Sequence, residues 1–213
     1  MITSNQPQAP AYFGFDVRFN KSQHPTLEES VRSSVRPLTP EEFLSARAEG
    51  AQVLDTRTAD DYVKSHVSLS INIGLGGKFA TWAGTVLDLH LPILIVADPG
   101  TEAEAVLRLG RIGFDHVAGY LEGGFGSLSP SWMVPEVVRE ASRVTALELP
   151  DHLAQHPDGV LLDVRTPGEY EQGSIEGNVF IPLNQLRERI DELPTDRPVT
   201  VYCGRGYRSA IAM

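Results

Sequence analysis

Residues 198–213 read PVTVYCGRGYRSAIAM, which predicts a strand, a turn and a helix in succession. Residues 198–202 are short, β-branched and apolar, which is typical of a buried strand, and residues 209–213 suit a first helical turn. Cys203, the only cysteine of the chain, therefore lies where backbone N–H groups converge and a helix dipole favours negative charge. This position predicts a reactive thiolate, and the alternative is a small buried core residue.

The loop after Cys203 carries two guanidinium groups, which stabilise a thiolate and can orient an oxyanion such as thiosulfate. Arg208 stands at the fifth position after the cysteine, whereas the wider phosphate loop of a cysteine phosphatase has its arginine at the sixth. The shorter loop suits one sulfur atom carried on the cysteine as a persulfide, so phosphatase or arsenate reductase chemistry is disfavoured. The predicted loop for persulfide and substrate is Gly204, Arg205, Gly206, Tyr207, Arg208 and Ser209.

A second informative stretch lies upstream, where residues 162–170 read LDVRTPGEY, residues 173–177 read GSIEG and residues 181–183 read IPL. The run 160–164 is apolar and ends in a charge, as a central parallel strand does at its carboxyl edge. Together with the cysteine loop, these motifs resemble the rhodanese family of sulfurtransferases. Ser174 stands where that family often has histidine, and we expect this position to pack the turn.

The resemblance implies an α/β fold with two rhodanese-like domains, each a mostly parallel β-sheet flanked by α-helices. It also implies sulfur transfer through a Cys203 persulfide, with no cofactor. Asp163 and Arg165 point to the same side of a strand and could pair or brace the active loop, and a purely structural ion pair or helix cap is favoured. Thr166 to Glu169 predicts a helix start, with Pro167 at its first position.

The chain carries this unit twice. Residues 54–62 repeat the upstream signature, with Asp55 corresponding to Asp163 at an offset of 108 residues. Residues 92–98 match residues 198–203, with Asp98 set against Cys203 at an offset of 105 residues. Such a long period indicates tandem domains. The predicted organisation is a linker-like segment 1–36, a silent domain 37–130, a linker 131–145 and a cysteine-bearing domain 146–213.

Asp98 occupies the position in the first repeat that Cys203 has in the second. A carboxylate cannot carry sulfane sulfur, and an acidic loop repels anionic donors, so the first domain is expected to be catalytically silent. We predict that Asp98 is a helix N-cap, with an acid/base role as the alternative. The following helix is expected at 103–112 and the next strand at 115–121.

Composition restricts the partners. The net charge of −10 argues against nucleic acid and anionic membranes, so an anionic substrate must be attracted locally by the loop. A lone reactive cysteine fits a reducing compartment, and no apolar run of about 18 residues exists, so the cytoplasm is the default expectation. The six histidines lack metal-ligand spacing, which predicts no metal site.

The two ends of the chain suggest a larger context. Residues 1–36, with the glycine-rich stretches 76–84 and 119–125, resemble fusion proteins that join a metallo-β-lactamase-fold domain to tandem rhodanese units. The resemblance implies such a domain or protein as a partner, although its metal-binding motif is absent here. Only ten residues follow Cys203, so we expect a second sheet without its last strand, either incomplete or completed by another chain.

The sequence thus favours a thiosulfate:cyanide-type sulfurtransferase, with a small anionic sulfur donor, thiosulfate or a persulfide, and a thiol or cyanide as acceptor. The alternative is a non-catalytic persulfide carrier or docking module that serves a partner enzyme.

Overall fold

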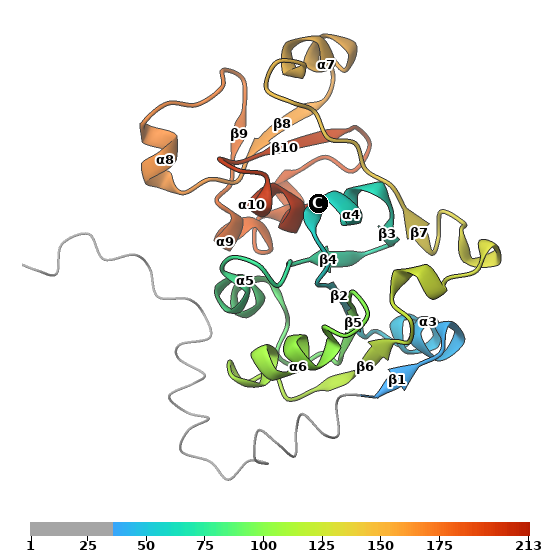
Figure 1. Cartoon of the computed structure of the whole chain (residues 1–213). Helices are drawn as coiled ribbons and strands as arrows, with labels where there is room; N and C mark the ends of the chain where they lie inside the picture. Colours follow the sequence, from blue (N-terminus) through green and yellow to red (C-terminus); the bar gives the residue numbers. More distant parts are fainter. Residues whose placement is uncertain (1–35) are drawn as a thin grey trace, which may run out of the picture. The chain divides into compact units, whose positions relative to one another are not determined.

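The computed structural model describes residues 36–213, so the predicted N-terminal linker lies, except for Arg36, outside the described residues (Figure 1). The described chain divides into two compact units. The first contains residues 36–56 and 75–129, and the second contains residues 57–74 and 130–213. Residues 57–74 belong to the first repeat in sequence and group with the cysteine-bearing residues in space.

The first unit contains four parallel strands in the order β1-β6-β5-β2. They are β1 (Pro37–Leu38), β6 (Val117–Leu121), β5 (Ile93–Val96) and β2 (Gln52–Asp55). All four residues of β5 are buried, because it lies between two neighbours and carries only branched apolar side chains. This strand is the counterpart of the one that precedes Cys203.

Helices of the first unit supply the apolar faces that cover this sheet. They are α3 (Pro40–Ala48), α5 (Phe79–Val86) and α6 (Glu102–Gly110), followed by the short turns η1 (Phe125–Ser127) and, in the second unit, η2 (Pro130–Trp132). Helix α6 buries Ala105, Val106 and Leu109, the spacing of one helix face. It covers most of the helix expected at 103–112.

The second unit contains three parallel strands in the order β10-β8-β9. They are β10 (Val199–Tyr202), β8 (Val160–Asp163) and β9 (Val179–Phe180). Around them lie α7 (Leu149–Gln155), α8 (Pro167–Glu171), α9 (Leu183–Leu186), η3 (Ile190–Glu192) and α10 (Tyr207–Ile211). The parallel sheets flanked by helices confirm the predicted α/β architecture.

Residues 57–74 add three short elements to the second unit: α4 (Ala59–Lys64), β3 (His66–Val67) and β4 (Ser70–Asn72). Strand β3 pairs antiparallel with β7 (Val138–Arg139), with His66 opposite Arg139. Helix α10, which begins directly after the cysteine loop, contacts both α4 and β4. The helix after the cysteine loop is therefore packed against a segment far away in the sequence.

Strand β10 differs from β5 in its surroundings. Among residues 36–213 it pairs with β8 alone, and each of its four residues is half-buried.

Across the same described range, no helix combines the length and the apolar character needed to cross a membrane.

Candidate active site

Cys203 follows β10 directly, and its loop leads into α10. The thiol is half-buried, and its Sγ accepts a hydrogen bond from the backbone N–H of Gly206 at 3.2 Å. The Ser209 hydroxyl lies 3.7 Å from Sγ and donates to the Gly206 carbonyl at 3.0 Å. Gly206 has φ +82°, a left-handed conformation that turns its N–H toward the sulfur and starts the helix.

The loop favours the thiolate form of Cys203. Burial alone would raise the pKa of the thiol, because it disfavours the charged form. Hydrogen bonds from the backbone N–H groups of Arg205, Ser209 and Gly206, together with the Ser209 side chain, outweigh burial and lower the pKa below its usual value. Stabilisation of the sulfur anion therefore comes chiefly from backbone N–H groups.

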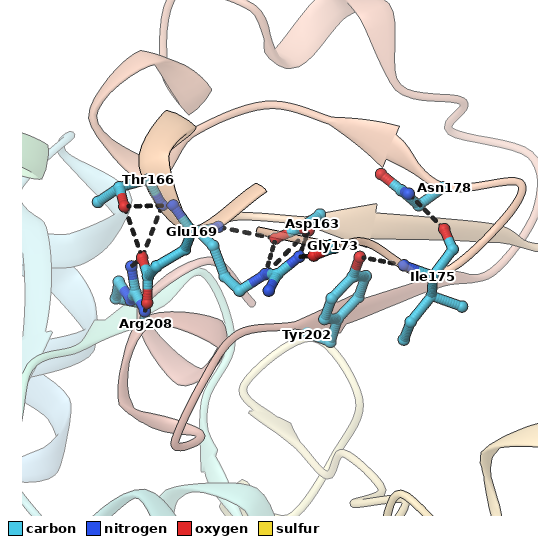
Figure 2. A network of polar contacts seen from close by, with 9 residues as sticks. Asp163, Thr166, Glu169, Gly173, Ile175, Asn178, Tyr202 and Arg208 are labelled. Atoms are coloured by element: carbon cyan, nitrogen blue, oxygen red, sulfur yellow. Dashed lines mark hydrogen bonds and ion pairs between the residues drawn. The ribbon is translucent and has the colours of Figure 1, made fainter. Parts of the chain in front are cut away.

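Arg208 is held by Glu169 in a two-point ion pair (Figure 2). Its Nη1 and Nη2 donate to the two carboxylate oxygens at 2.6 and 2.7 Å. The ion pair raises the pKa of Arg208, and the charge of the Cys203 thiolate raises it further. Arg208 therefore lies between a carboxylate and the nucleophile, with both terminal nitrogens engaged by the carboxylate.

Glu169 is fixed by the helix that carries it. Thr166 is the N-cap of α8, Pro167 is its first residue, and the Glu169 carboxylate accepts the Thr166 N–H at 2.9 Å and its hydroxyl at 2.7 Å. This capping box confirms the predicted helix start. The hydrogen bond from Arg208 comes first among the causes that lower the pKa of Glu169 far below its ordinary value, so the carboxylate is charged at neutral pH.

Asp163 and Arg165 form the expected ion pair at the carboxyl end of β8 (Figure 2). Arg165 Nε lies 3.0 Å from both carboxylate oxygens, and Nη2 donates to Asp163 at 2.7 Å and to the Gly173 carbonyl at 2.8 Å. Asp163 is fully buried, which would raise its pKa, but hydrogen bonds from Arg165 and Tyr202 lower it overall. The pair ties the end of β8 to the turn at Gly173, next to the strand that carries the nucleophile.

The family description Rhodanese-like domain matches residues 39–129 and 145–213, most of the chain. The chain belongs to the rhodanese-like family. It is 37% identical over 68 residues to a sulfurtransferase of Allochromatium vinosum, covering 32% of this chain and 64% of that protein. It is 38% identical over 66 residues to the thiosulfate sulfurtransferase PspE of Escherichia coli, covering 30% and 60%. The chain thus spans less than two thirds of the length of these curated relatives.

Among solved structures, a thiosulfate sulfurtransferase from Pseudomonas aeruginosa is similar with a TM-score of 0.39 and 20% identity. The similarity covers 87% of this chain and 42% of that one.

Arg205 differs from Arg208 in its environment. It is exposed, and within residues 36–213 its guanidinium makes no ion pair. Of the two arginines in the rhodanese loop, Arg205 is therefore the one available to an external anion. The neighbouring Tyr207 is bound within the protein, since its hydroxyl donates to the Gly74 carbonyl at 3.0 Å.

The prediction that Asp98 is a helix N-cap is wrong. Helix α6 begins at Glu102 with Thr101 as its N-cap, because a turn through Gly100 (φ +94°) separates Asp98 from the helix. The Asp98 carbonyl accepts the Thr101 N–H at 3.0 Å, and its side chain is exposed. The Glu102 carboxylate accepts the Gly100 N–H at 2.8 Å, so this loop satisfies its own N–H group.

The expected packing role at the histidine position is found in one repeat only. His66 is buried, and its ring stacks on Tyr62 with centroids 4.0 Å apart. Ser174 is exposed, and Tyr170 stacks on Phe180 instead, with centroids 4.1 Å apart. The prediction that Ser174 packs the turn is therefore wrong, because Tyr170 packs on Phe180 of β9 and leaves Ser174 in solvent.

Sequence reasoning missed two features of this site. Glu169 was recognised only as part of a helix start, since the partner of its carboxylate is 39 residues away. Arg143 gave no signal, although its guanidinium lies beside Gly206. An acidic residue in the upstream signature and arginines in the cysteine loop could have suggested the contact of Glu169 with Arg208. Nothing in the sequence indicated that Arg143 lies beside Gly206.

Proposed function

We propose that this chain is a rhodanese-type sulfurtransferase in which Cys203 carries a sulfane sulfur from an anionic donor to a thiophilic acceptor. The observation that carries the proposal is the convergence of backbone N–H groups on the Cys203 sulfur, which lowers its pKa. The thiolate is the nucleophilic form of cysteine, and the same N–H groups can hold the charge of a persulfide. Membership of the rhodanese-like family supports sulfur transfer in general.

In the first step the Cys203 thiolate attacks the outer sulfur of the donor. A Cys203 S–S bond forms while the donor bond to that sulfur breaks, and the electron pair leaves with sulfite when the donor is thiosulfate. The products are the Cys203 persulfide anion and sulfite, so charge and sulfur balance. The backbone N–H groups of the loop stabilise the terminal sulfur, as they stabilise the thiolate before it.

In the second step an acceptor nucleophile attacks the terminal sulfur. Cyanide gives thiocyanate, and a thiolate gives a new persulfide, while the Cys203 thiolate leaves in its original form. No net oxidation occurs, and no cofactor is required. The Cys203 persulfide links the two steps, and the first product leaves before the acceptor reacts, which predicts ping-pong kinetics.

The two arginines of the loop have different roles in this proposal. Arg205 is exposed and binds the leaving oxyanion, because a guanidinium presents paired N–H donors that match an oxyanion. Arg208 is occupied by Glu169 and acts on the thiolate through its charge. Asp163 and Arg165 support the strand end without contacting substrate.

The functional organisation follows from the loops. We assign catalysis to the domain 146–213, with 131–145 as the linker, and a silent role to the domain 37–130, which contains no cysteine. The register of β2 with β5 matches that of β8 with β10, so Ala97, and not Asp98 as predicted, follows its strand as Cys203 does. A partner of metallo-β-lactamase fold stays a prediction, supported by the sequence resemblance at residues 76–84 and 119–125.

The test is the intact mass of the protein after brief incubation with thiosulfate, followed by turnover with cyanide. The parent should gain one sulfur, about 32 Da, and release it to cyanide, whereas Cys203→Ser should gain none. Sulfur uptake without turnover would instead favour the persulfide carrier. No uptake from thiosulfate or from a small-molecule persulfide, with the thiol still open to alkylation, would refute the proposal.

A further inference from the structure

Arg143 brings a third guanidinium to the Cys203 loop. A Cβ atom placed on Gly206 would lie 2.8 Å from Arg143 Nη2, so the guanidinium occupies the space that a side chain at position 206 would take. Gly206 is the residue whose N–H binds the Cys203 sulfur. Arg143 therefore lies against the same residue of the loop that holds the nucleophile.

The position of Arg143 is fixed by the segment that carries it. Residues 137–141 are bound to residues 57–74 by backbone hydrogen bonds: Ser68 N–H donates to the Val137 carbonyl at 2.8 Å, and Ala141 N–H donates to the Val63 carbonyl at 2.9 Å. Between them β7 pairs with β3. Arg143 lies two residues after Ala141, so these backbone hydrogen bonds hold it beside α4 and the start of α10.

An ion pair orients the guanidinium. Arg143 Nη1 binds the carboxylate of Asp60, in the first turn of α4, which leaves Nη2 on the side of the loop. The Arg143 side chain retains 48% of its accessible surface, so a dissolved anion can reach it. A half-exposed guanidinium with one edge anchored and the other directed at the active loop is suited to bind an oxyanion.

The charges around the loop make this guanidinium useful. Both terminal nitrogens of Arg208 are bound by Glu169, whereas Arg143 gives one terminal nitrogen to Asp60. The chain carries a net charge of −10, and an anionic donor must therefore be attracted by local positive groups. Arg205 and Arg143 are the cations at the loop that stay accessible to solvent.

We propose that Arg143, together with Arg205, binds the anionic group of the sulfur donor. The inference rests on the proposed function and deepens it by naming a further residue that binds the donor. The three sulfonate oxygens of thiosulfate can accept hydrogen bonds from more than one guanidinium group, which suits a donor bound by both arginines.

The first test compares Arg143→Gln with Arg139→Gln, a matched control that removes the same charge from an exposed arginine of the same segment. Arg143→Gln should lower kcat/KM for thiosulfate about tenfold or more, mainly through KM, since a charge-assisted hydrogen bond is lost. Arg143→Lys should recover part of the loss because the charge returns without the paired donors. Arg139→Gln should stay within about twofold of the parent. Equal losses in the two glutamine variants would overturn the proposal.

A second measurement does not depend on sulfur transfer. Cys203 is the only cysteine, so its alkylation by anionic iodoacetate and by neutral iodoacetamide can be followed by intact mass. The ratio of the two rates should fall about threefold or more in Arg143→Gln and stay unchanged in Arg139→Gln. An unchanged ratio in Arg143→Gln would overturn anion binding by Arg143. Failure of both thiosulfate and a small-molecule persulfide to load the parent, with the ratio still lowered in Arg143→Gln, would refute the sulfurtransferase proposal alone.

Discussion

The two strand–loop–helix units of this chain share a backbone plan and differ in what the loop binds. After β5, the Gly100 N–H is used by the Glu102 carboxylate and the Thr101 N–H by the Asp98 carbonyl. After β10, the N–H groups of the loop converge on the Cys203 sulfur. In the first loop a carboxylate of the same loop, Glu102, accepts the N–H hydrogen bond, whereas in the second loop the N–H groups bind the reactive sulfur. The comparison shows that a few residues in one turn decide between a closed turn and an anion site.

The strongest test of this comparison moves the cysteine. Cys203→Ser with Ala97→Cys, the position that follows β5 as Cys203 follows β10, should load no sulfur from thiosulfate, a loss of roughly 10³-fold or more, because the new thiol lacks the converging N–H groups. Intact mass after thiosulfate treatment measures it. The parent and Cys203→Ser are the controls. Sulfur uptake by the double variant at a rate near that of the parent would show that the strand–turn–helix plan alone suffices.

The next test concerns matched carboxylates in the two capping turns. Glu169 caps α8 and binds Arg208, whereas Asp61, at the corresponding position of the first repeat, accepts from the Thr58 hydroxyl and pairs with Lys64. Glu169→Gln should lower the rate of sulfur loading about tenfold, because Arg208 loses the two-point contact that holds it beside the thiolate. Asp61→Asn should change that rate less than about twofold. Equal effects would show that Glu169 acts only as a helix cap.

Glu169 also predicts a pH dependence of stability. Its pKa is lower in the folded chain than its ordinary value of 4.5, so the stabilisation is complete above that pH and is lost progressively as the pH falls below it. Thermal melting between about pH 5 and pH 2.5 should therefore decline more steeply for the parent than for Glu169→Gln. Parallel declines in the two proteins would contradict the assignment.

Alanine substitution of one glycine in each loop can distinguish backbone strain from a loss of sulfur loading. Gly206 (φ +82°) and Gly100 (φ +94°) both adopt left-handed conformations, one in each loop. Replacing either by alanine should cost about 1 kcal/mol in the free energy of unfolding. Only Gly206→Ala should also slow sulfur loading, by about threefold to tenfold, because strain at position 206 shifts the N–H that binds the sulfur and the new Cβ displaces Arg143. A loss of activity in Gly100→Ala as well would assign the effect to general destabilisation.

The smallest expected effect concerns Ser209, whose hydroxyl helps to lower the pKa of Cys203. Ser209→Ala should move the pH profile of iodoacetamide alkylation to higher pH and reduce the rate at neutral pH about twofold to threefold. The backbone N–H groups remain, so reactivity is retained. A profile identical to that of the parent would show that the backbone alone sets the thiolate population.

Much of this fold could be predicted from local sequence. The strands at 160–163 and 199–202 and the capped start of α8 follow from apolar runs and turn chemistry within a few residues. Asp98 was misassigned because Gly100 inserts a turn before the helix, which a residue-type preference for N-caps does not register. Arg143 could not be predicted, since its partner Asp60 is 83 residues away and the contact exists only after β7 pairs with β3.

Strand β10 carries the nucleophile at the rim of its sheet, with a strand neighbour on one side among residues 36–213. Its amide hydrogens should exchange with deuterium faster than those of β5, which is buried and paired on both sides, because rim strands open with less free energy. Because the Cys203 loop follows β10 directly, an anion bound in the loop should slow deuterium uptake in β10 more than in β5.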